Sequence, residues 1–380
     1  MKYFVIAGEA SGDLHGSQLM ASLKQYDPEA QFRFLGGDLM AAQAGSDPII
    51  HYRNMAFMGF LEVIRHLHAI LGFLGTARHA IDEWQPDAVV LIDYPSFNLR
   101  VAKYAHNLGY KVFYFISPKV WAWKEWRVKD IKRYVDRVYS ILPFEVEFYR
   151  RHDYDVDYVG NPTVHEIAAA LPAMPAWEDF SVQQGLDPTL PLIALVPGSR
   201  QKEIRDNLPS MLAAASRHTD CQMAIAAAPG IDDALYRSIL EKHQVACPVV
   251  RDATWTLVRH ARVALVTSGT ATLETALLGT PQVACYRMNG SKWTYRVGSS
   301  MIKTKFVTLP NLITDEAIIP ELLVHNCTVD AIDGWITSLL PKDSGARTAM
   351  LDGYGRMKAQ LGTDHCTDVA AQRIVKECTA

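Results

Sequence analysis

Short and wholly apolar segments recur along this chain, and they constrain its fold more strongly than any other feature of the sequence. Residues 88–92, 192–196 and 263–266 are clear examples, and each is followed by small or polar turn residues and then by helix-compatible sequence. Strands that are buried on both faces have such uninterrupted apolar runs, and they occur in parallel sheets that helices cover on both sides. We therefore expect an α/β protein that contains parallel sheets.

The expected strands fall into two series, which a segment rich in proline and small residues separates. This segment spans residues 161–190 and contains Pro162, Pro172, Pro175 and Pro188, a composition typical of a linker. Two strand–helix series joined by a linker predict two facing Rossmann-like domains with a cleft between them. The strands are expected at residues 3–7, 31–35, 88–92, 111–116 and 137–142 in the first series and at 192–196, 223–227, 262–266 and 281–285 in the second.

The domain boundaries follow from these two series. The first domain is predicted to span residues 1–163, and the second is predicted to span residues 164–340. From Ala317 onward the sequence is expected to be helical throughout. Residues 341–380 are predicted to form C-terminal helices that pack back toward the first domain or against a partner subunit, which allows for a homodimer.

Composition and charge exclude several classes of protein. A chain of 380 residues with 49% hydrophobic and 21% charged residues can fill the cores of two domains. The net charge of −3 argues against a nucleic-acid-binding protein. The six cysteines form no Cys-x-x-Cys pair, which favours reduced thiols over a disulfide framework or a zinc site. No segment approaches the roughly 18 apolar residues of a membrane-spanning helix, so we expect a protein that is soluble or lies on a membrane surface.

The junction at residues 267–274 is a candidate site for an anion. An apolar strand ends there at Ser268 and Gly269, and a helix is expected to begin at once near Thr270. Such a junction presents unpaired backbone N–H groups and the positive end of a helix dipole, where phosphate binds well. Glu274, four residues into the helix, would accept hydrogen bonds from sugar hydroxyls. The alternative is an ordinary corner that Ser268 or Thr270 caps.

Asp93 is the candidate general base of the first half of the chain. It follows directly after the apolar segment at residues 88–92. A carboxylate at the carboxyl end of a central parallel strand points into the ligand crevice of such a fold, where it can accept a proton. The alternative is a carboxylate that caps a helix or forms a turn.

Residues 119–133 form a basic cluster that is interleaved with tryptophan. The segment has six Lys or Arg residues and three Trp residues, against the two acids Glu125 and Asp130. Such a cluster predicts a site for a substrate phosphate or for lipid head groups. The alternative is a solvated basic helix.

A second unusual segment, between Arg53 and Trp84, has more large apolar side chains than one buried helix stripe requires. Arginine and histidine residues are interspersed with them, and an apolar surface with basic residues at its edge is typical of a protein that lies in the interface of an anionic membrane. The alternative is a long helix that is buried on two faces. The candidate membrane or acyl-chain residues are Phe57, Met58, Phe60, Leu61, Ile64 and Leu67.

Seven short motifs in sequence resemble the lipid-A-disaccharide synthase family, and their order agrees with that family from residue 3 to about residue 325. Any one of these motifs is weak, whereas seven in the family's order are specific. They are Ala-Gly-Glu-Ala-Ser-Gly-Asp at 7–13, Ser-Pro-Lys-Val-Trp-Ala-Trp at 117–123, Leu-Pro-Phe-Glu at 142–145, Pro-Gly-Ser-Arg at 197–200, Ser-Gly-Thr-Ala-Thr-Leu-Glu at 268–274, Tyr-Arg-Met at 286–288 and Leu-Pro-Asn-Leu at 309–312.

The resemblance implies an inverting glycosyltransferase with the two-domain GT-B architecture. Its donor would be UDP-2,3-diacylglucosamine and its acceptor 2,3-diacylglucosamine 1-phosphate. The products would be UDP and the β-1,6-linked disaccharide 1-phosphate of lipid A. The resemblance also implies a cytoplasmic enzyme that is peripherally associated with the inner membrane of a Gram-negative bacterium.

The resemblance also implies roles for individual residues. Asp93 would be the catalytic base. The residues that would bind UDP and the donor are Gly198, Ser199, Arg200, Ser268, Gly269, Thr270, Glu274, Arg287 and Asn311. The loops that would face the acceptor contain Glu9, Ser11, Gly12, Ser117 and Trp121.

Three positions depart from the family's pattern. His165 stands where relatives often have aspartate, and we assign it no role. Relatives often have aspartate where this chain has Ser96, which strengthens the case for Asp93 as the base. Lys119 stands where the family has serine, so the loop's contact with the acceptor is expected to differ.

No cofactor or metal site is expected. Asp155 and Asp157 form an Asp-x-Asp pair of the kind that holds a metal in many glycosyltransferases. They lie at the entry to a short strand, and no nucleotide-binding loop follows them, so we interpret the pair as part of a surface strand.

Two other functions compete with this interpretation. One is a different UDP-sugar enzyme of the same architecture, such as a UDP-N-acetylglucosamine 2-epimerase or a transferase for another lipid-linked acceptor. An epimerase needs no apolar surface, so residues 57–74 argue against it. The other is a non-catalytic lipid or nucleotide binder, against which the joint presence of Asp93, Arg200 and Glu274 argues.

Overall fold

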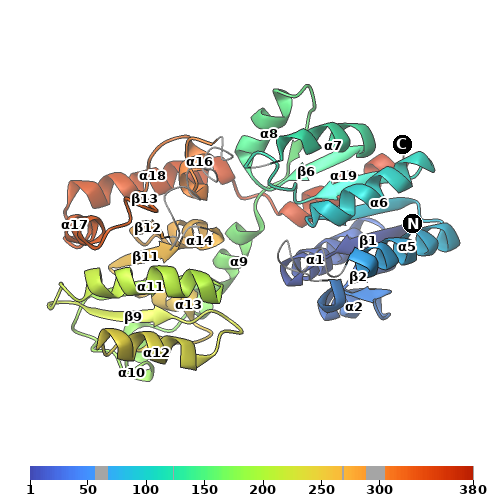
Figure 1. Cartoon of the computed structure of the whole chain (residues 1–380). Coiled ribbons are helices and arrows are strands. Elements are labelled where there is room, and N and C mark those ends of the chain that lie inside the picture. The colour runs from blue at the N-terminus through green and yellow to red at the C-terminus, as the bar shows by residue number, and fades with distance from the viewer. Residues whose placement is uncertain (56–66, 123, 268, 288–303, 380) are drawn as a thin grey trace. The chain divides into compact units, whose positions relative to one another are not determined.

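The chain folds into two compact units, which are described separately below. The computed structural model describes residues 1–55, 67–122, 124–267, 269–287 and 304–379. The first unit contains Met1–Pro162 and Thr363–Ala380, and the second contains Thr163–Gly362. Figure 1 follows the chain from the first unit into the second and, through the last helix, back to the first.

The first unit is built on a seven-stranded sheet in which every pairing is parallel. Its strand order, β3-β2-β1-β4-β5-β6-β7, reverses direction between β1 and β4, where Ala7 pairs with Ile92. The strands are β1 (Lys2–Ala7), β2 (Gln31–Gly36), β3 (Ile50–His51), β4 (Ala88–Ile92), β5 (Lys111–Phe115), β6 (Arg137–Ser140) and β7 (Asp157–Tyr158).

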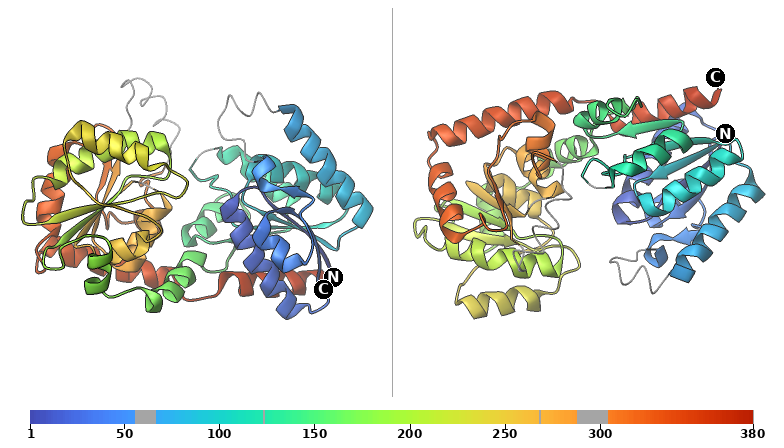
Figure 2. Two further views of the ribbon diagram at one scale, coloured as in Figure 1. Left: turned by 90° about the horizontal axis from the view of Figure 1, so that it is seen from below. Right: turned by 45° about the horizontal axis from the view of Figure 1, so that its top comes forward.

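Helices cover both faces of this sheet, because successive side chains of a strand point to opposite faces (Figure 2). Phe4 and Ile6 belong to one apolar core, which α5, α6, α7 and α8 complete. Tyr3 and Val5 belong to the other core, which α1 and α19 complete. The helices are α1 (Ala10–Tyr26), α2 (Asp38–Ala44), α3 (Tyr52–Met55), α5 (Leu67–Trp84), α6 (Pro95–Asn107), the short 3-10 helix η1 (Glu125–Arg127), α7 (Val128–Tyr134), α8 (Pro143–Arg150) and α19 (Cys366–Thr379).

The second unit repeats this design with a six-stranded parallel sheet. Its order, β10-β9-β8-β11-β12-β13, reverses between β8 and β11, where Val196 pairs with Val266. The strands are β8 (Leu192–Val196), β9 (Gln222–Ala226), β10 (Val249–Val250), β11 (Val263–Thr267), β12 (Gln282–Tyr286) and β13 (Glu321–Leu323). The helices are α9 (Pro162–Ala170), η2 (Leu171–Ala173), α10 (Trp177–Gln183), α11 (Gln201–Ala215), α12 (Asp233–His243), α13 (Thr254–His260), α14 (Thr270–Leu278), α16 (Leu309–Thr314), α17 (Val329–Leu339) and α18 (Gly345–Leu361).

The predicted fold class, two Rossmann-like domains with parallel sheets, is confirmed. The segment at residues 161–190, predicted to be the linker, contains the boundary between the two units, at Pro162 and Thr163. It also contains α9, η2 and α10, and Pro162 is tolerated there because it occupies a first helical turn, where its missing N–H costs nothing. One detail of the sequence analysis was wrong. The expected all-helical C-terminal part contains β13, a three-residue strand that pairs only with β12 and is too short to give a periodic signal.

The C-terminal segment at residues 341–380 is divided between the units. Helix α18 belongs to the second unit, and α19 belongs to the first. Helix α19 packs on α1, and the Ser22 hydroxyl donates a hydrogen bond to the Asp368 carboxylate at 2.6 Å. The last helix therefore closes one face of the sheet that the N-terminus begins.

A buried carboxylate, Asp13, organises the start of α2. The backbone N–H groups of Gly37, Leu39 and Met40 donate to it at 2.8, 3.1 and 3.1 Å. These groups form the first turn of α2 and have no partners within the helix. Asp13 belongs to the motif at residues 7–13, so part of that motif serves the fold.

Asp13→Ala is expected to lower the free energy of unfolding by about 2 kcal/mol or more, since it removes a cap and leaves buried N–H groups without an acceptor. Asp47→Ala, at an exposed position of the same unit, is the matched control and should change stability by less than about 0.5 kcal/mol. Urea unfolding followed by circular dichroism measures both variants. Equal unfolding midpoints for the two would contradict the assigned role.

Candidate functional site

In both units, candidate residues follow the two strands at which the strand order reverses. In the first unit, Glu9 follows β1 and Asp93 follows β4. In the second unit, Arg200 follows β8 and Gly269 follows β11. The carboxyl ends of strands at such a reversal form the ligand crevice of doubly wound sheets. Each unit therefore has its candidate residues at the position where this fold binds ligands.

Asp93 lies in a tight turn that its neighbours hold in place. Asp93 and Tyr94 have φ values of 42° and 45°, a left-handed conformation that costs non-glycine residues roughly 1–3 kcal/mol each. The Asp93 carbonyl oxygen accepts hydrogen bonds from the Tyr114 hydroxyl and from Nδ2 of Asn98, the latter at 2.8 Å. Strain of this kind persists only where surrounding contacts fix the backbone, so the turn presents the Asp93 carboxylate in one place.

Tyr94 ties this turn to the loop after β1. Its hydroxyl donates to the carbonyl of Met55 at 3.0 Å, and its ring lies on Gly8. A Cβ added to Gly8 would lie 2.3 Å from the ring carbon Cγ, so only glycine fits there. Sequence reasoning missed Tyr94, Asn98 and Tyr114 as supports of the turn. Asn98 lies five residues after Asp93 and in the first turn of the helix that follows it, and that spacing was the available signal.

Burial raises the pKa of Asp93 to about 6, and the negative charge of Glu9 adds to this rise. The Lys119 ammonium group and the backbone N–H of Tyr94 act in the opposite direction. Glu9 itself is exposed and accepts a hydrogen bond from the Ser11 hydroxyl at 2.8 Å. A carboxylate with this pKa is mostly ionised at neutral pH and is a stronger base than an ordinary aspartate.

The loop after β5 has internal supports. Ser117 is buried, and its hydroxyl lies 2.7 Å from the Tyr149 hydroxyl. The Trp121 indole N–H donates to Glu145 at 2.9 Å, and the Ser140 hydroxyl donates to the other oxygen of the same carboxylate. Burial raises the pKa of Glu145 to about 8. The Ser117 hydroxyl and the Trp121 indole N–H are therefore engaged in hydrogen bonds within the protein.

The predicted acceptor residues therefore divide into two groups. Ser117, Trp121 and Gly12 support the fold, and Gly12 packs so closely on β1 that an added Cβ would lie 3.2 Å from that of Ala7. Glu9 and Ser11 are exposed beside the turn that contains Asp93. The loop also exposes Lys119, whose charge lowers the pKa of both Asp93 and Glu145.

In the second unit, the junction between β11 and α14 is open among the residues that the structure describes. Gly269 is the N-cap of α14 and has a φ of 154°, in a region that essentially only glycine occupies. No described side chain caps this helix, and Gly269 and Thr270 are exposed. The buried hydroxyl of Thr267, just before the junction, has no hydrogen-bond partner in the described part of the chain. Ser268 lies outside the described residues.

Glu274 is half-buried in the same helix. One of its oxygens accepts a hydrogen bond from the Trp255 indole at 2.9 Å. Burial raises the pKa of Glu274, and the negative charge of Glu166 adds to the rise. Trp255 lies in the first turn of α13, which follows β10, so it orients Glu274 from a second helix that begins at the same edge of the sheet. Sequence reasoning missed Trp255.

The loop at Arg200 is closed by a residue that sequence reasoning missed. The backbone N–H groups of Ser199 and Arg200 donate to one oxygen of Glu203 at 3.0 and 3.3 Å. Gly198 has a φ of 120°, and an added Cβ would lie 2.7 Å from that of Glu203. The N–H groups of this loop are therefore engaged within the protein. The Arg200 side chain is 67% exposed and makes a 3.4 Å ion pair with Glu203, which leaves most of its donors in solvent.

Arg287 follows β12 and reaches α11. Its backbone N–H donates to Asn207 at 2.7 Å, and its guanidinium donates to the Ser210 hydroxyl. With Arg205 and Lys242 it lines a pocket of about 400 Å³. The structure thus fixes Arg287 on the flank of α11, at the end of a central strand.

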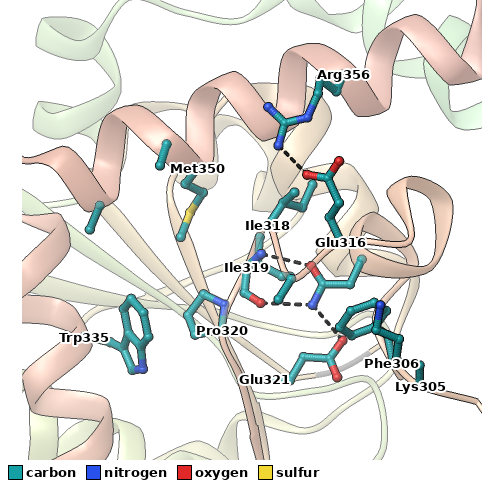
Figure 3. A pocket seen from close by; sticks show the side chains of 14 residues that line it. Lys305, Phe306, Glu316, Ile318, Ile319, Pro320, Glu321, Trp335, Met350 and Arg356 are labelled. Atoms are coloured by element: carbon teal, nitrogen blue, oxygen red, sulfur yellow. Dashed lines mark hydrogen bonds and ion pairs between the residues drawn. The ribbon is translucent and has the colours of Figure 1, made fainter.

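Asn311, predicted to contact the nucleotide, is held by hydrogen bonds within the protein. It is 1% exposed, and its Nδ2 donates to the carbonyl of Ile319 and to Glu321, both at 3.0 Å. Its Oδ1 accepts from the N–H of Ile319 at 2.9 Å. Asn311 lines a pocket of about 630 Å³. Figure 3 labels its partners Ile319 and Glu321 in this pocket, together with Glu316 and Arg356, which pair at 2.6 Å. Since both amide hydrogens are used, Asn311 positions the start of β13.

The candidate membrane residues lie mainly outside the described residues. This holds for Phe57, Met58, Phe60, Leu61 and Ile64 and for the side chain of Leu67. In the described part of α5, Leu71 is half-exposed, whereas Leu74 and Ala77 are buried. None of the helices among the described residues has the length and apolar character that a membrane crossing requires.

In the Asp-x-Asp pair, Asp157 takes part in the fold of the first unit, and Asp155 is exposed. Asp157 forms an ion pair with Arg373 of α19. Within the described residues, no three His, Cys, Asp or Glu side chains gather as a metal site would require.

Comparisons with known proteins agree on one family. A family model described as lipid-A-disaccharide synthetase matches residues 3–371. A lipid-A-disaccharide synthase of Nitrosococcus oceani is 35% identical over 379 residues, covering 99% of this chain and 94% of that protein. A lipid-A-disaccharide synthase of Acidobacterium capsulatum is 37% identical over 382 residues, covering 97% of this chain and 93% of that protein.

Solved structures share the fold at much lower identity. The UDP-GlcNAc 2-epimerase of Neisseria meningitidis, solved with UDP-GlcNAc bound, has a TM-score of 0.63 at 10% identity, covering 100% of this chain and 99% of that one. The calicheamicin glycosyltransferase CalG4 has a TM-score of 0.58 at 15% identity, covering 99% and 97%. At these identities the similarity shows the fold alone.

Proposed function

Since the chain belongs to the lipid-A-disaccharide synthetase family, we propose that Asp93 is the general base of its sugar transfer. The protein is a UDP-sugar-dependent glycosyltransferase of lipid A synthesis. The observation that carries the proposal is the environment of Asp93. Its carboxylate stands at the strand-order reversal of the first sheet, in a turn fixed by Tyr114 and Asn98, and its pKa is raised to about 6.

The substrates in this proposal are UDP-2,3-diacylglucosamine as donor and 2,3-diacylglucosamine 1-phosphate as acceptor. Asp93 accepts the proton of the acceptor's 6-hydroxyl while that oxygen attacks the anomeric carbon of the donor. The bond from the anomeric carbon to the diphosphate breaks, so the configuration inverts and UDP leaves. The products are the β-1,6-linked disaccharide 1-phosphate and UDP.

The second unit is proposed to bind the leaving UDP without a metal ion. The exposed N-terminus of α14 at Gly269 and Thr270 offers N–H donors and a positive dipole to the diphosphate. Arg200 adds a full positive charge on an exposed guanidinium. Glu274, oriented by Trp255, accepts hydrogen bonds from the ribose hydroxyls. Charge that develops on the diphosphate is thus neutralised by protein groups.

The epimerase alternative is supported less well. The epimerases share the fold with this chain at 10–12% identity, whereas proteins with 34–37% identity over nearly the whole chain are lipid-A-disaccharide synthases. The raised pKa of Asp93 also makes this carboxylate suited to accept the proton of an acceptor hydroxyl, which a transferase requires.

Asp93→Asn is expected to reduce kcat/KM at least about a hundredfold, because the amide cannot accept the proton. In the unchanged protein, kcat/KM should rise with pH through about 6 and then level, since only the ionised carboxylate is active. Lys119→Gln removes a charge that lowers the pKa of Asp93 and should move this rise to higher pH. Glu9→Gln removes a charge that raises this pKa and should move the rise to lower pH.

A pH–rate profile of the three variants checks this assignment. Asp93 is not the base if Lys119→Gln and Glu9→Gln move the pH–rate profile in the same direction. It is also not the base if Asp93→Asn keeps an activity within a few-fold of the unchanged protein.

Arg200→Ala is expected to weaken UDP binding about tenfold or more, because a hydrogen bond to a charged group contributes roughly 1.5–3 kcal/mol. Arg237→Ala, an exposed arginine of α12, is the control and should leave UDP binding unchanged. Isothermal titration with UDP measures both variants, and a chelator should not alter the transfer rate. Equal affinities of the two variants would exclude Arg200 from the diphosphate site.

We also propose that the protein works at the cytoplasmic face of the inner membrane, which it touches through the apolar residues near 57–67. Replacing Met58, Phe60 and Leu61 together with serine should release the protein from anionic vesicles, since the buried apolar area is lost. Val182→Ser, a 73% exposed apolar position on α10, is the control. Sedimentation with vesicles measures binding. Unchanged sedimentation, or loss of the folded state, would show that these residues do not form a membrane surface.

A further inference from the structure

Arg127 has an unusual environment for a charged side chain. Among the residues whose burial the structure describes, it is the one lysine or arginine with less than a tenth of its surface exposed, at 8%. Its Nη2 donates a hydrogen bond to the Ser96 hydroxyl at 2.9 Å. No ion pair in the described part of the chain includes Arg127. Its guanidinium also lies 5.7 Å from the ring centroid of Trp126, and the charge of Asp130 acts on it without forming an ion pair. A buried cation without an ion pair is costly, because its desolvation is offset only in part.

The other buried charged side chains of the described residues are well satisfied. Asp13 accepts three backbone N–H groups, and Glu145 accepts Trp121 and Ser140. Asp206 pairs with Lys202 at 3.1 Å. The fold thus gives its buried carboxylates direct hydrogen-bond or ion-pair partners, whereas the buried arginine has no ion pair among the described residues and feels the Asp130 charge only from beyond ion-pair distance.

Two further positive groups, the N-terminus of α6 and Lys124, lie near the Arg127 guanidinium. Ser96 lies in the first turn of α6, a helix of 13 residues whose N-cap, Tyr94, makes no side-chain capping bond. The positive end of the helix dipole and the guanidinium therefore meet at one point. Burial lowers the pKa of Lys124, and the nearby positive charge of Arg127 lowers the pKa of Lys124 further. Burial also lowers the pKa of Arg127 itself.

The rest of the basic cluster behaves as a solvated helix. Lys129, Lys132 and Arg133 on α7 are exposed. Lys132 donates to the carbonyl of His152 at 3.2 Å, and Arg133 lies over the ring of Tyr134. The alternative of a solvated basic face thus holds for α7, and Arg127 is the exception at its start.

We propose that Arg127, together with the N-terminus of α6 at Ser96, binds the phosphate of the acceptor sugar. The inference rests on the proposed function, in which one sugar ring has both the attacking hydroxyl and a phosphate. The base and the phosphate site must then be close neighbours. Asp93 and Ser96 meet this condition, since they stand three residues apart on either side of the start of α6. A guanidinium matches phosphate geometry because it donates two parallel hydrogen bonds.

Ser96 leaves the positive charge of Arg127 free to attract a phosphate, because its hydroxyl is neutral. An aspartate at position 96 would give Arg127 a counterion within the protein. The serine hydroxyl only accepts one hydrogen bond and leaves the charge uncompensated. The inference therefore concerns this chain and its serine, and it provides a second variant that neutralises Arg127 without removing it.

The test compares two acceptors, diacylglucosamine 1-phosphate and the same sugar without its phosphate. Arg127→Gln and Ser96→Asp should each raise KM for the phosphorylated acceptor about tenfold to a hundredfold, the effect of losing a charge-assisted hydrogen bond. KM for the acceptor without phosphate and KM for the UDP-sugar should not change. Lys129→Gln, an exposed cation of α7, is the control and should behave as the unchanged protein.

Ser96→Asp keeps the test decisive if Arg127→Gln fails to fold. Position 96 is exposed, and an aspartate in the first turn of a helix is favourable. Equal losses on both acceptors would show that Arg127 only supports the fold and would overturn the inference, as would unchanged KM values. If the unchanged protein transfers to neither acceptor, the proposed function itself fails. Failure of the inference alone leaves transfer by the unchanged protein intact.

Discussion

The reversal of strand order in each sheet is the constraint on which the rest of the structure depends. In the first unit, the helix after β1 packs on one face of the sheet and the helix after β4 packs on the other. The loops that lead to these helices diverge, so the carboxyl ends of the two strands stay open. Asp93 and Glu9 stand at this opening. The second unit repeats the reversal between β8 and β11, with Arg200 and Gly269 at the corresponding places.

Burial and fixed partners then give each candidate residue its chemistry. The turn at Asp93 is held by Tyr114, Asn98 and Tyr94, and it places a carboxylate where burial raises its pKa to about 6. In the second unit, the start of α14 at Gly269, which no described side chain caps, and the exposed Arg200 favour an anion instead. Several motif residues instead stabilise the loops and helices that carry the candidate residues. Asp13 caps α2, Glu145 holds the loop after β5 through Trp121, and Asn311 anchors the start of β13.

Sequence patterns predicted the central strands to within a residue or two, because strands such as β4 and β8 are buried on both faces and therefore wholly apolar. They missed β3, β10 and β13, which are edge strands of two or three residues and have too few side chains for a periodic signal. The positions of Asp93, Arg200 and Glu274 followed from strand–loop–helix order. The roles of Asn311 and Ser117 did not, because a motif residue that binds a ligand and one that satisfies buried backbone look the same in sequence. The partners Tyr114, Trp255 and Glu203 come from other elements, so only the folded chain brings them to the site.

The central claim is that this chain joins two acylated glucosamine units with Asp93 as the base. The most direct measurement incubates the purified protein, and the Asp93→Asn variant, with UDP-2,3-diacylglucosamine and 2,3-diacylglucosamine 1-phosphate, and detects products by mass spectrometry. The account predicts the tetraacyl disaccharide 1-phosphate with one equivalent of UDP from the unchanged protein and at most traces from the variant. Equal product from both proteins, or UDP release without disaccharide, would contradict it.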